Sequence, residues 1–122
     1  MKTKTNNIIH WVLTGLVGIV FLGSGASKLI GSEDSLKMAQ GFGLSASNFT
    51  MLGIIEILSV LLFIYPRTGV LGTLLLAAYM GGAVATHLEH GQSVLAPVII
   101  SAFVWIVAVL RFSELRNRIQ NN

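Results

Sequence analysis

The sequence contains no cysteine, and charged residues are scarce. The absence of cysteine excludes disulfides, thiolate metal sites and dithiol redox chemistry within this chain. Asp, Glu, Lys and Arg make up 11% of the residues, whereas soluble domains carry about 25%. Because so few charges cannot cover a folded chain with a polar surface, we expect the protein to be surrounded by lipid.

Proline is also rare, and the few charges are unevenly placed. The two prolines, Pro66 and Pro97, lie where helices are expected to end or begin. The net charge of +3 comes from 8 Lys and Arg against 5 Asp and Glu. The basic residues gather at the two ends of the chain and in one turn, which favours anionic lipid headgroups over nucleic acid as a partner. The sequence has no phosphate-binding loop, Ser-His-Asp order or long basic tract.

Apolar residues are abundant, at 53% of the chain. Four apolar stretches approach the ~17–25 residues that a spanning helix needs, and none shows the alternation of a barrel strand. Because a helix satisfies its own backbone hydrogen bonds in lipid, the sequence predicts an all-α, integral membrane four-helix bundle. We expect one domain over 1–122, with spans at about 8–30, 49–65, 69–87 and 94–110.

Turn signals separate these spans. Pro66 ends the second helix, and Gly91 permits a left-handed backbone before the fourth, for which Ser93 is the predicted N-cap. The longer first connection contains Ser32-Glu33-Asp34-Ser35, which is typical of a helix start. A short interfacial helix is therefore predicted here, lying on the membrane surface through Leu36, Met38, Ala39 and Phe42.

The placement of Lys and Arg predicts the orientation. Only Lys28 and Lys37 lie on one side of the predicted spans. We therefore place both termini in the cytoplasm and the chain in a bacterial inner membrane. The basic residues on the cytoplasmic side are Lys2, Lys4, Arg67, Arg111, Arg116 and Arg118. Aromatic residues near the same ends are expected at the membrane interface, namely Trp11, Tyr65 and Phe112.

The first apolar stretch also has features of a signal peptide. Lys2 and Lys4 precede an apolar core that is followed by the small residues of 23–27. The apolar core is long for a signal peptide, however, and three more apolar stretches follow it. We therefore expect an uncleaved first span.

Glu56 is the most informative polar residue. It lies about seven positions into the second predicted span, which is roughly 10 Å into a hydrocarbon core about 30 Å thick. A lone carboxylate at that depth costs several kcal/mol, so it must be protonated, paired or facing a wet cavity.

Helix direction identifies the residues that can reach Glu56. A helical side chain leans toward the N-terminus of its own helix. Lys28 and His87 therefore lean into the membrane from its outer side, while Glu56 leans outward toward them. Ser24 lies one turn from Lys28, and Tyr79 shares the face of His87. The sequence predicts that these five residues form a polar pocket in the outer half of the bundle, which binds a ligand.

Several alternatives stay open at this point. Lys28 and Glu56 can be a structural ion pair that fixes helix register or part of a ligand site. We expect the pocket to open near His90 and Gln92. His87 and His90 have the spacing of a two-ligand metal face, but no further cluster of ligands supports one, so we expect no metal. Small residues on the third helix favour packing within the bundle over a homo-oligomer.

Four stretches together resemble the DoxX-like family of small bacterial membrane proteins. They are "FLGSGASKLIG", "GIIEILSVLLFIYPRTGVLG", "AVATHLEHG" and "APVIISAFVWIVAVLR". The resemblance implies a four-helix inner-membrane bundle in which Lys28, Glu56 and His87 stand where the family tends to carry these residue types. The family takes its name from a subunit linked to thiosulfate–quinone oxidation, and relatives are tied to redox complexes or to assembly of other membrane proteins.

The sequence therefore predicts an accessory or binding component with no evident cofactor and no catalytic activity of its own. Its pocket would hold a small or lipid-like ligand or dock a membrane or periplasmic protein. The alternative is a quinone-binding subunit of an oxidoreductase, with His87 and Tyr79 bonding the quinone carbonyls and Glu56 exchanging protons. A small-solute transporter or channel ranks lower, because no polar stripe continues inward past Ala77, Leu74 and Val70.

Overall fold

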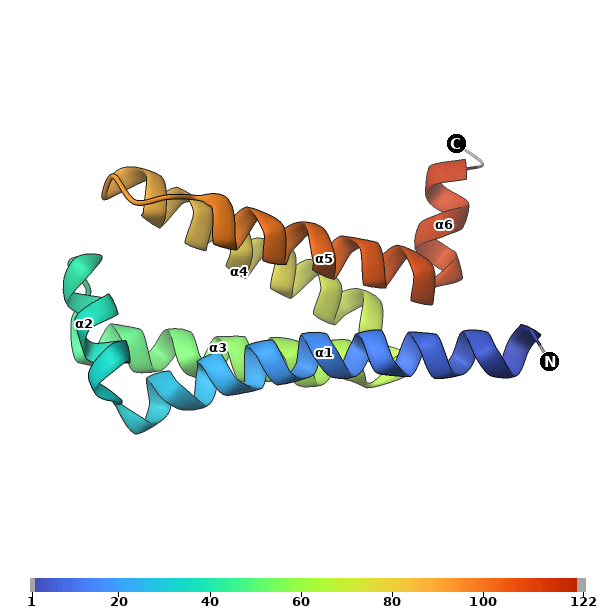
Figure 1. Ribbon diagram of the computed structural model, residues 1–122, viewed down its shortest axis with the longest axis horizontal. Helices are drawn as coiled ribbons and strands as arrows, with labels where there is room; N and C mark the ends of the chain where they lie inside the picture. The colour runs from blue at the N-terminus through green and yellow to red at the C-terminus, as the bar shows by residue number, and fades with distance from the viewer. Residues whose placement is uncertain (1, 121–122) are drawn as a thin grey trace.

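The computed structural model describes the backbone of residues 2–120 and the side chains of residues 6–120. Figure 1 shows helices joined by short turns, and residues 2–120 contain no strand. The prediction of an all-α chain is confirmed for this part. The elements are α1 (Lys2–Ile30), α2 (Glu33–Gly41), α3 (Ala46–Ile64), η1 (Pro66–Thr68), α4 (Gly69–Glu89), α5 (Leu95–Arg111) and α6 (Ser113–Gln120).

Three helices are long and apolar enough to cross a membrane, at Asn6–Ile30, Ala46–Ile64 and Pro66–Glu89. The fourth predicted span corresponds to α5, whose 17 residues lie at the lower limit for a spanning helix. It counts as a fourth span only when it is joined to α6, which bends away by 94°. Apart from the start of α1, the predicted boundaries lie within three residues of the observed ones.

Serine side chains start two of the helices. Ser32 Oγ accepts a hydrogen bond from Ser35 N at 3.2 Å, as the sequence motif predicts, and Ser45 Oγ accepts one from Asn48 N. The prediction of Ser93 as the N-cap of α5 is wrong. Val94 occupies that position without a side-chain cap, and Ser93, one residue earlier, accepts through Oγ from N of Leu95, the first residue of α5.

Helix α6 was not predicted from the sequence. An arginine on α6 stabilises the sharp bend between α5 and α6. Arg116 Nη1 donates to Val109 O at 3.0 Å and to Leu110 O at 2.5 Å. The last carbonyls of a helix have no partner within that helix. Arg116 therefore caps the C-terminus of α5, and the chain turns back across that end.

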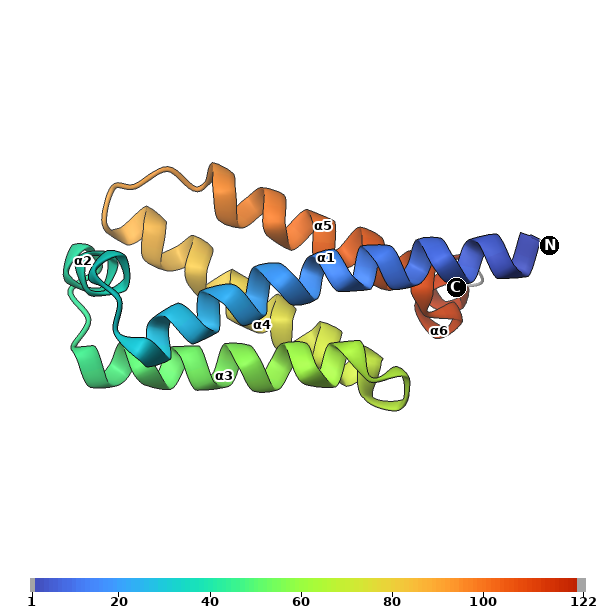
Figure 2. The same cartoon turned by 60° about the horizontal axis from the view of Figure 1, so that its bottom comes forward.

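The long helices pack in a fixed order. Helix α1 contacts α3 and α5, while α4 contacts α3 and α5, as Figures 1 and 2 show from two sides. Two glycines bring α1 and α3 together. A Cβ atom on Gly53 would lie 2.8 Å from Lys28 Cβ and 2.9 Å from Gly25 O. Only glycine at position 53 therefore allows this close approach, directly beside Lys28.

Apolar side chains cover the outside of the molecule as well as its centre. Ile19, Ile30 and Leu95 are 72%, 80% and 66% exposed, and a surface of this kind matches lipid better than water.

The prediction that Phe112 lies at the membrane interface is wrong. Phe112 is buried and packs edge-on against Phe63. The buried core consists of Val17, Phe21, Val60, Phe63, Leu76, Met80, Val104, Val107, Ala108 and Phe112.

Helix α2 packs onto the ends of α1 and α3, where Figure 1 shows it at one end of the molecule. The expectation that its apolar face lies on the membrane surface is wrong for Ala39 and Phe42, which are buried within the protein. Ser27 Oγ on α1 forms hydrogen bonds with Ser32 Oγ at 2.8 Å and Ser35 Oγ at 2.7 Å. These bonds fix the start of α2 against α1.

Candidate functional site

Lys28 and Glu56 form an ion pair between α1 and α3. Lys28 Nζ lies 2.8 Å from Glu56 Oε1, and the two residues are only 8% and 2% exposed. A buried charge is costly to leave without a partner. The pair therefore satisfies two groups that neither helix could bury alone.

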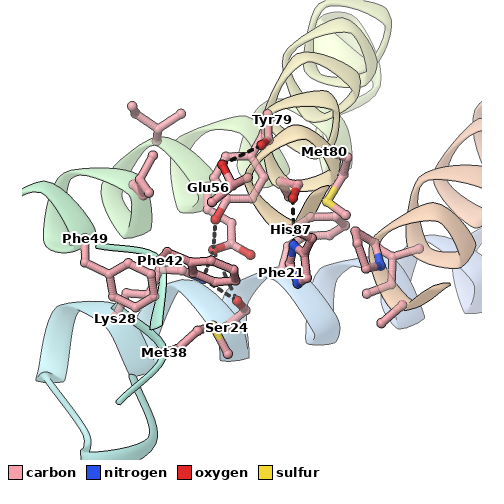
Figure 3. Close-up of a pocket in the computed structure, with 18 of the residues that line it drawn as sticks. Phe21, Ser24, Lys28, Met38, Phe42, Phe49, Glu56, Tyr79, Met80 and His87 are labelled. Carbon is pink, nitrogen blue, oxygen red and sulfur yellow. Dashed lines mark hydrogen bonds and ion pairs between the residues drawn. The ribbon is translucent and has the colours of Figure 1, made fainter. Parts of the chain in front are cut away.

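Three donors converge on one oxygen of Glu56. Lys28 Nζ, Ser24 Oγ and Tyr79 Oη donate to Oε1 at 2.8, 3.2 and 3.1 Å. Lys28 Nζ also donates to Ser24 Oγ at 2.7 Å. Figure 3 shows these side chains meeting from α1, α3 and α4. The structure thus brings together four of the five residues that the sequence singled out.

The other oxygen of Glu56, Oε2, has no hydrogen-bond partner among the described residues. In residues 6–120, every fully buried side-chain nitrogen and oxygen has a hydrogen-bond partner. Oε2 makes no hydrogen bond with these residues, because all three protein donors bind Oε1. An oxygen without a partner is therefore not fully buried, and since Glu56 lines a cavity between the helices, we infer that Oε2 lies on the wall of that cavity.

Aromatic rings surround the ammonium group of Lys28. Its Nζ lies 5.3 Å from the ring centroid of Phe49 and 6.0 Å from that of Tyr79. A cation at this distance is attracted to the face of a ring, and more strongly where water is excluded. The rings therefore add to the stabilisation that Glu56 provides.

His87 lies on the same cavity but does not bond to the ion pair. Its Nδ1 lies 2.6 Å from Ala83 O, and its ring centroid is 4.8 Å from that of Phe42. Because a carbonyl oxygen only accepts, Nδ1 must carry the hydrogen. In the neutral ring this leaves Nε2 as an acceptor.

The cavity has a volume of about 580 Å³, which is within the usual range of small-molecule sites. Its wall is mostly apolar, and the phenylalanine and methionine side chains on it were not predicted as site residues. The sequence contained one signal for these residues. Met38 and Phe42 are four residues apart, which places them on the same apolar face of the predicted short helix. The unpredicted residues that line it include Phe21, Met38, Phe42, Phe49 and Met80.

His90 and Gln92, near which the opening was predicted, do not line the cavity themselves. His90 Nδ1 bonds Thr86 O at 2.9 Å, and Gln92 lies beside Gly41 at the end of α2. Helix α2 and the turn after α4 therefore meet at this end of the molecule.

The family model of the DoxX-like family matches residues 12–110, which include every residue on the cavity wall. The chain belongs to the DoxX-like family. The resemblance predicted from its sequence is thereby confirmed, and the protein is a DoxX-like membrane protein with several apolar helices. No curated protein and no solved structure matches the chain.

The part of this DoxX-like protein that the structure describes holds no group of three or more His, Asp or Glu side chains suited to a metal ion. His87 and His90, which have the spacing of a two-ligand face, each bond through Nδ1 to the carbonyl four residues earlier. The chemistry that the site offers is therefore hydrogen bonding and charge within an apolar space.

Proposed function

We propose that this DoxX-like protein is a binding component of the membrane, without catalytic activity of its own. Its cavity holds a small amphiphilic molecule. One observation carries this proposal: a carboxylate oxygen, Glu56 Oε2, lies on the wall of a largely apolar cavity. The apolar wall suits the body of such a molecule, and the carboxylate oxygen suits its polar end.

The arrangement of donors favours a ligand site over a purely structural ion pair. A pair that only fixes helix register is best satisfied when the protein bonds both carboxylate oxygens. Here Ser24, Lys28 and Tyr79 all bond Oε1. A ligand that bonds Oε2 would complete the set without disturbing the contacts between the helices.

The contacts give less support to the quinone alternative. A quinone offers only carbonyl acceptors, so it needs donors on the wall. Tyr79 Oη already donates to Glu56, and His87 Nδ1 donates to Ala83 O. Binding a quinone through these two residues would require the Tyr79 bond to break, and it would require His87 either to break its bond to Ala83 O or to carry a second proton on Nε2.

We also propose an inner-membrane location with cytoplasmic termini. The N-terminus and α6 lie at one end of the molecule and α2 lies at the other (Figure 1). Arg111 and Arg116 lie at the end that carries the N-terminus and cap the C-termini of α3 and α5. This end should therefore face the cytoplasm, where Lys and Arg are enriched.

The chain has no cysteine, so single-cysteine variants test the orientation directly. Gln92 and Ser113 are exposed and lie at opposite ends. A membrane-impermeant maleimide applied to spheroplasts should label Gln92→Cys, and it should label Ser113→Cys only after lysis. The opposite pattern would invert the proposed topology.

Two neighbouring glycines on α4 provide a matched test of ligand binding. A Cβ atom on Gly81 or Gly82 would meet no atom within 4 Å, and of the two only Gly82 lines the cavity. Gly82→Leu should therefore narrow the cavity without straining the fold, and Gly81→Leu should leave the cavity unchanged.

The probes are 4-octylphenol and its methyl ether, 4-octylanisole, measured by native mass spectrometry of protein released from detergent micelles. We expect the wild type and Gly81→Leu to retain at least one probe, with at least tenfold weaker retention by Gly82→Leu. Equal retention by all three proteins, or none by the wild type, would refute the proposed binding function.

A further inference from the structure

Two cavity-lining residues, Glu56 and His87, offer acceptors that no described donor bonds. Glu56 Oε2 has no bond to the described residues, and Nε2 of a neutral His87 is a second acceptor. The hydroxyl donors nearby are already used, and the one N–H of Lys28 without an acceptor lies among the rings of Phe49 and Tyr79. Tyr79 Oη and Ser24 Oγ donate to Glu56, and Lys28 Nζ donates to both Ser24 and Glu56.

The charge at the site favours a neutral ligand. Lys28 and Glu56 cancel at 2.8 Å, so a ligand cation would add a net positive charge beside the ammonium of Lys28. A ligand anion would meet Oε2 directly. Burying an unpaired charge in an apolar space is costly in either case.

We propose that the ligand is a neutral amphiphile whose hydroxyl group donates a hydrogen bond to Glu56 Oε2. Its apolar body lies among the aromatic and methionine side chains of the wall, including Phe42 and Met80. This inference rests on the proposed binding function and adds the chemical class of the ligand.

The two probes test this inference, because they differ in one property. The phenol donates a hydrogen bond, and the methyl ether, with nearly the same apolar body, only accepts. A bond from a neutral donor to a buried carboxylate is among the stronger kinds. We therefore expect wild-type protein to bind the phenol roughly tenfold tighter than the ether or more.

A double variant reverses the polarity of the wall. In K28M/E56Q, the glutamine oxygen can still accept from Ser24 and Tyr79, and the amide nitrogen takes the place of Oε2. The cavity then presents a donor in place of an acceptor. The preference for phenol over ether should fall to about twofold or less, while Gly81→Leu keeps the wild-type preference.

Charged relatives of the probe test the neutral class without any variant. Both 4-octylbenzylamine, a cation near neutral pH, and 4-octylbenzoate, an anion, should bind wild-type protein at least tenfold more weakly than 4-octylphenol. Tighter binding of either charged probe would overturn the inference, whether or not K28M/E56Q folds.

The outcomes separate this inference from the proposed function. If phenol and ether bind equally and Gly82→Leu weakens both, the cavity binds amphiphiles and the hydroxyl assignment is wrong. If the preference for phenol persists in K28M/E56Q, the hydroxyl does not bond Glu56. If neither probe binds the wild type, the proposed function itself fails.

Discussion

Removing one member of the buried ion pair should be far more damaging than removing both. In Lys28→Met, the carboxylate of Glu56 stays buried at 2% exposure with only Ser24 and Tyr79 as donors. In Glu56→Gln, the ammonium of Lys28 stays buried at 8% exposure without a counter-charge. In K28M/E56Q no charge is buried, and the glutamine oxygen keeps both neutral donors.

The magnitudes follow from the burial of both groups. Breaking a buried ion pair from one side costs about 3–5 kcal/mol, and we expect each single variant in this range. Replacing both members is often close to neutral, so the double variant should lie within about 1.5 kcal/mol of the wild type. The coupling energy between the two sites should then be about 4.5 kcal/mol or more, well above the usual range for independent sites.

Equilibrium unfolding in mixed detergent micelles measures these differences. The fluorescence of Trp11 and Trp105 provides the signal, because both lie on long helices outside the ion pair. Additive effects, with the double variant as unstable as the sum of the singles, would refute the claim that Lys28 and Glu56 stabilise each other.

Three further predictions concern contacts around the site and at its supports. Gly53→Ala should destabilise the protein by about 1–3 kcal/mol, because its Cβ would lie 2.8 Å from Lys28 Cβ. Gly15→Ala, whose Cβ would meet no atom within 4 Å, should not destabilise the protein in the same unfolding assay. Arg111→Met removes hydrogen bonds of 2.6 Å and 2.5 Å to the last carbonyls of α3. It should lower the free energy of unfolding by about 1.5–3 kcal/mol, whereas substitution of the exposed Arg118 by Met should have little effect. An equal effect of both variants would contradict a capping role for Arg111. Ser27→Ala removes two hydrogen bonds to the start of α2. It should speed amide hydrogen exchange within residues 33–41 alone. Unchanged exchange there would show that the serines do not hold α2 against α1.

The sequence was sufficient to predict the four long helices and α2, because their limits depend on local chemistry. Pro66 cannot continue α3, and Gly91 adopts a φ of +67° in the turn before α5. Helix α6 was missed because its bend depends on Arg116, which reaches back to carbonyls six and seven residues earlier. No local pattern in the sequence predicts that contact.

The direction of the helices was enough to predict that Ser24, Lys28, Glu56 and Tyr79 lie together. Each side chain leans toward the N-terminus of its own helix, and the antiparallel order of the helices makes those directions converge. His87 leans the same way but bonds Ala83 O within its own helix. A carbonyl four residues earlier is always within reach of such a ring, and periodicity cannot decide between it and a partner across the bundle.

The shape of the cavity could not be predicted. The face of α2 that carries Phe42 was expected to meet the membrane surface, and it packs inside the protein. An amphipathic helix has the same pattern whether its apolar face meets lipid or protein. The pairing of Ser27 with Ser32 and Ser35 decides between them, and it depends on the three-dimensional fold.

Photolabelling tests the central claim most directly. The protein in bicelles is irradiated with 4-octylphenol that carries a diazirine on its chain, and labelled positions are mapped by peptide mass spectrometry. Our account predicts labelling at Met38, Phe42 and Met80 on the cavity wall, which excess 4-octylphenol prevents and Gly82→Leu reduces. Labelling confined to the exposed outer positions Ile19, Leu58 and Ile106, unchanged by the competitor, would contradict it.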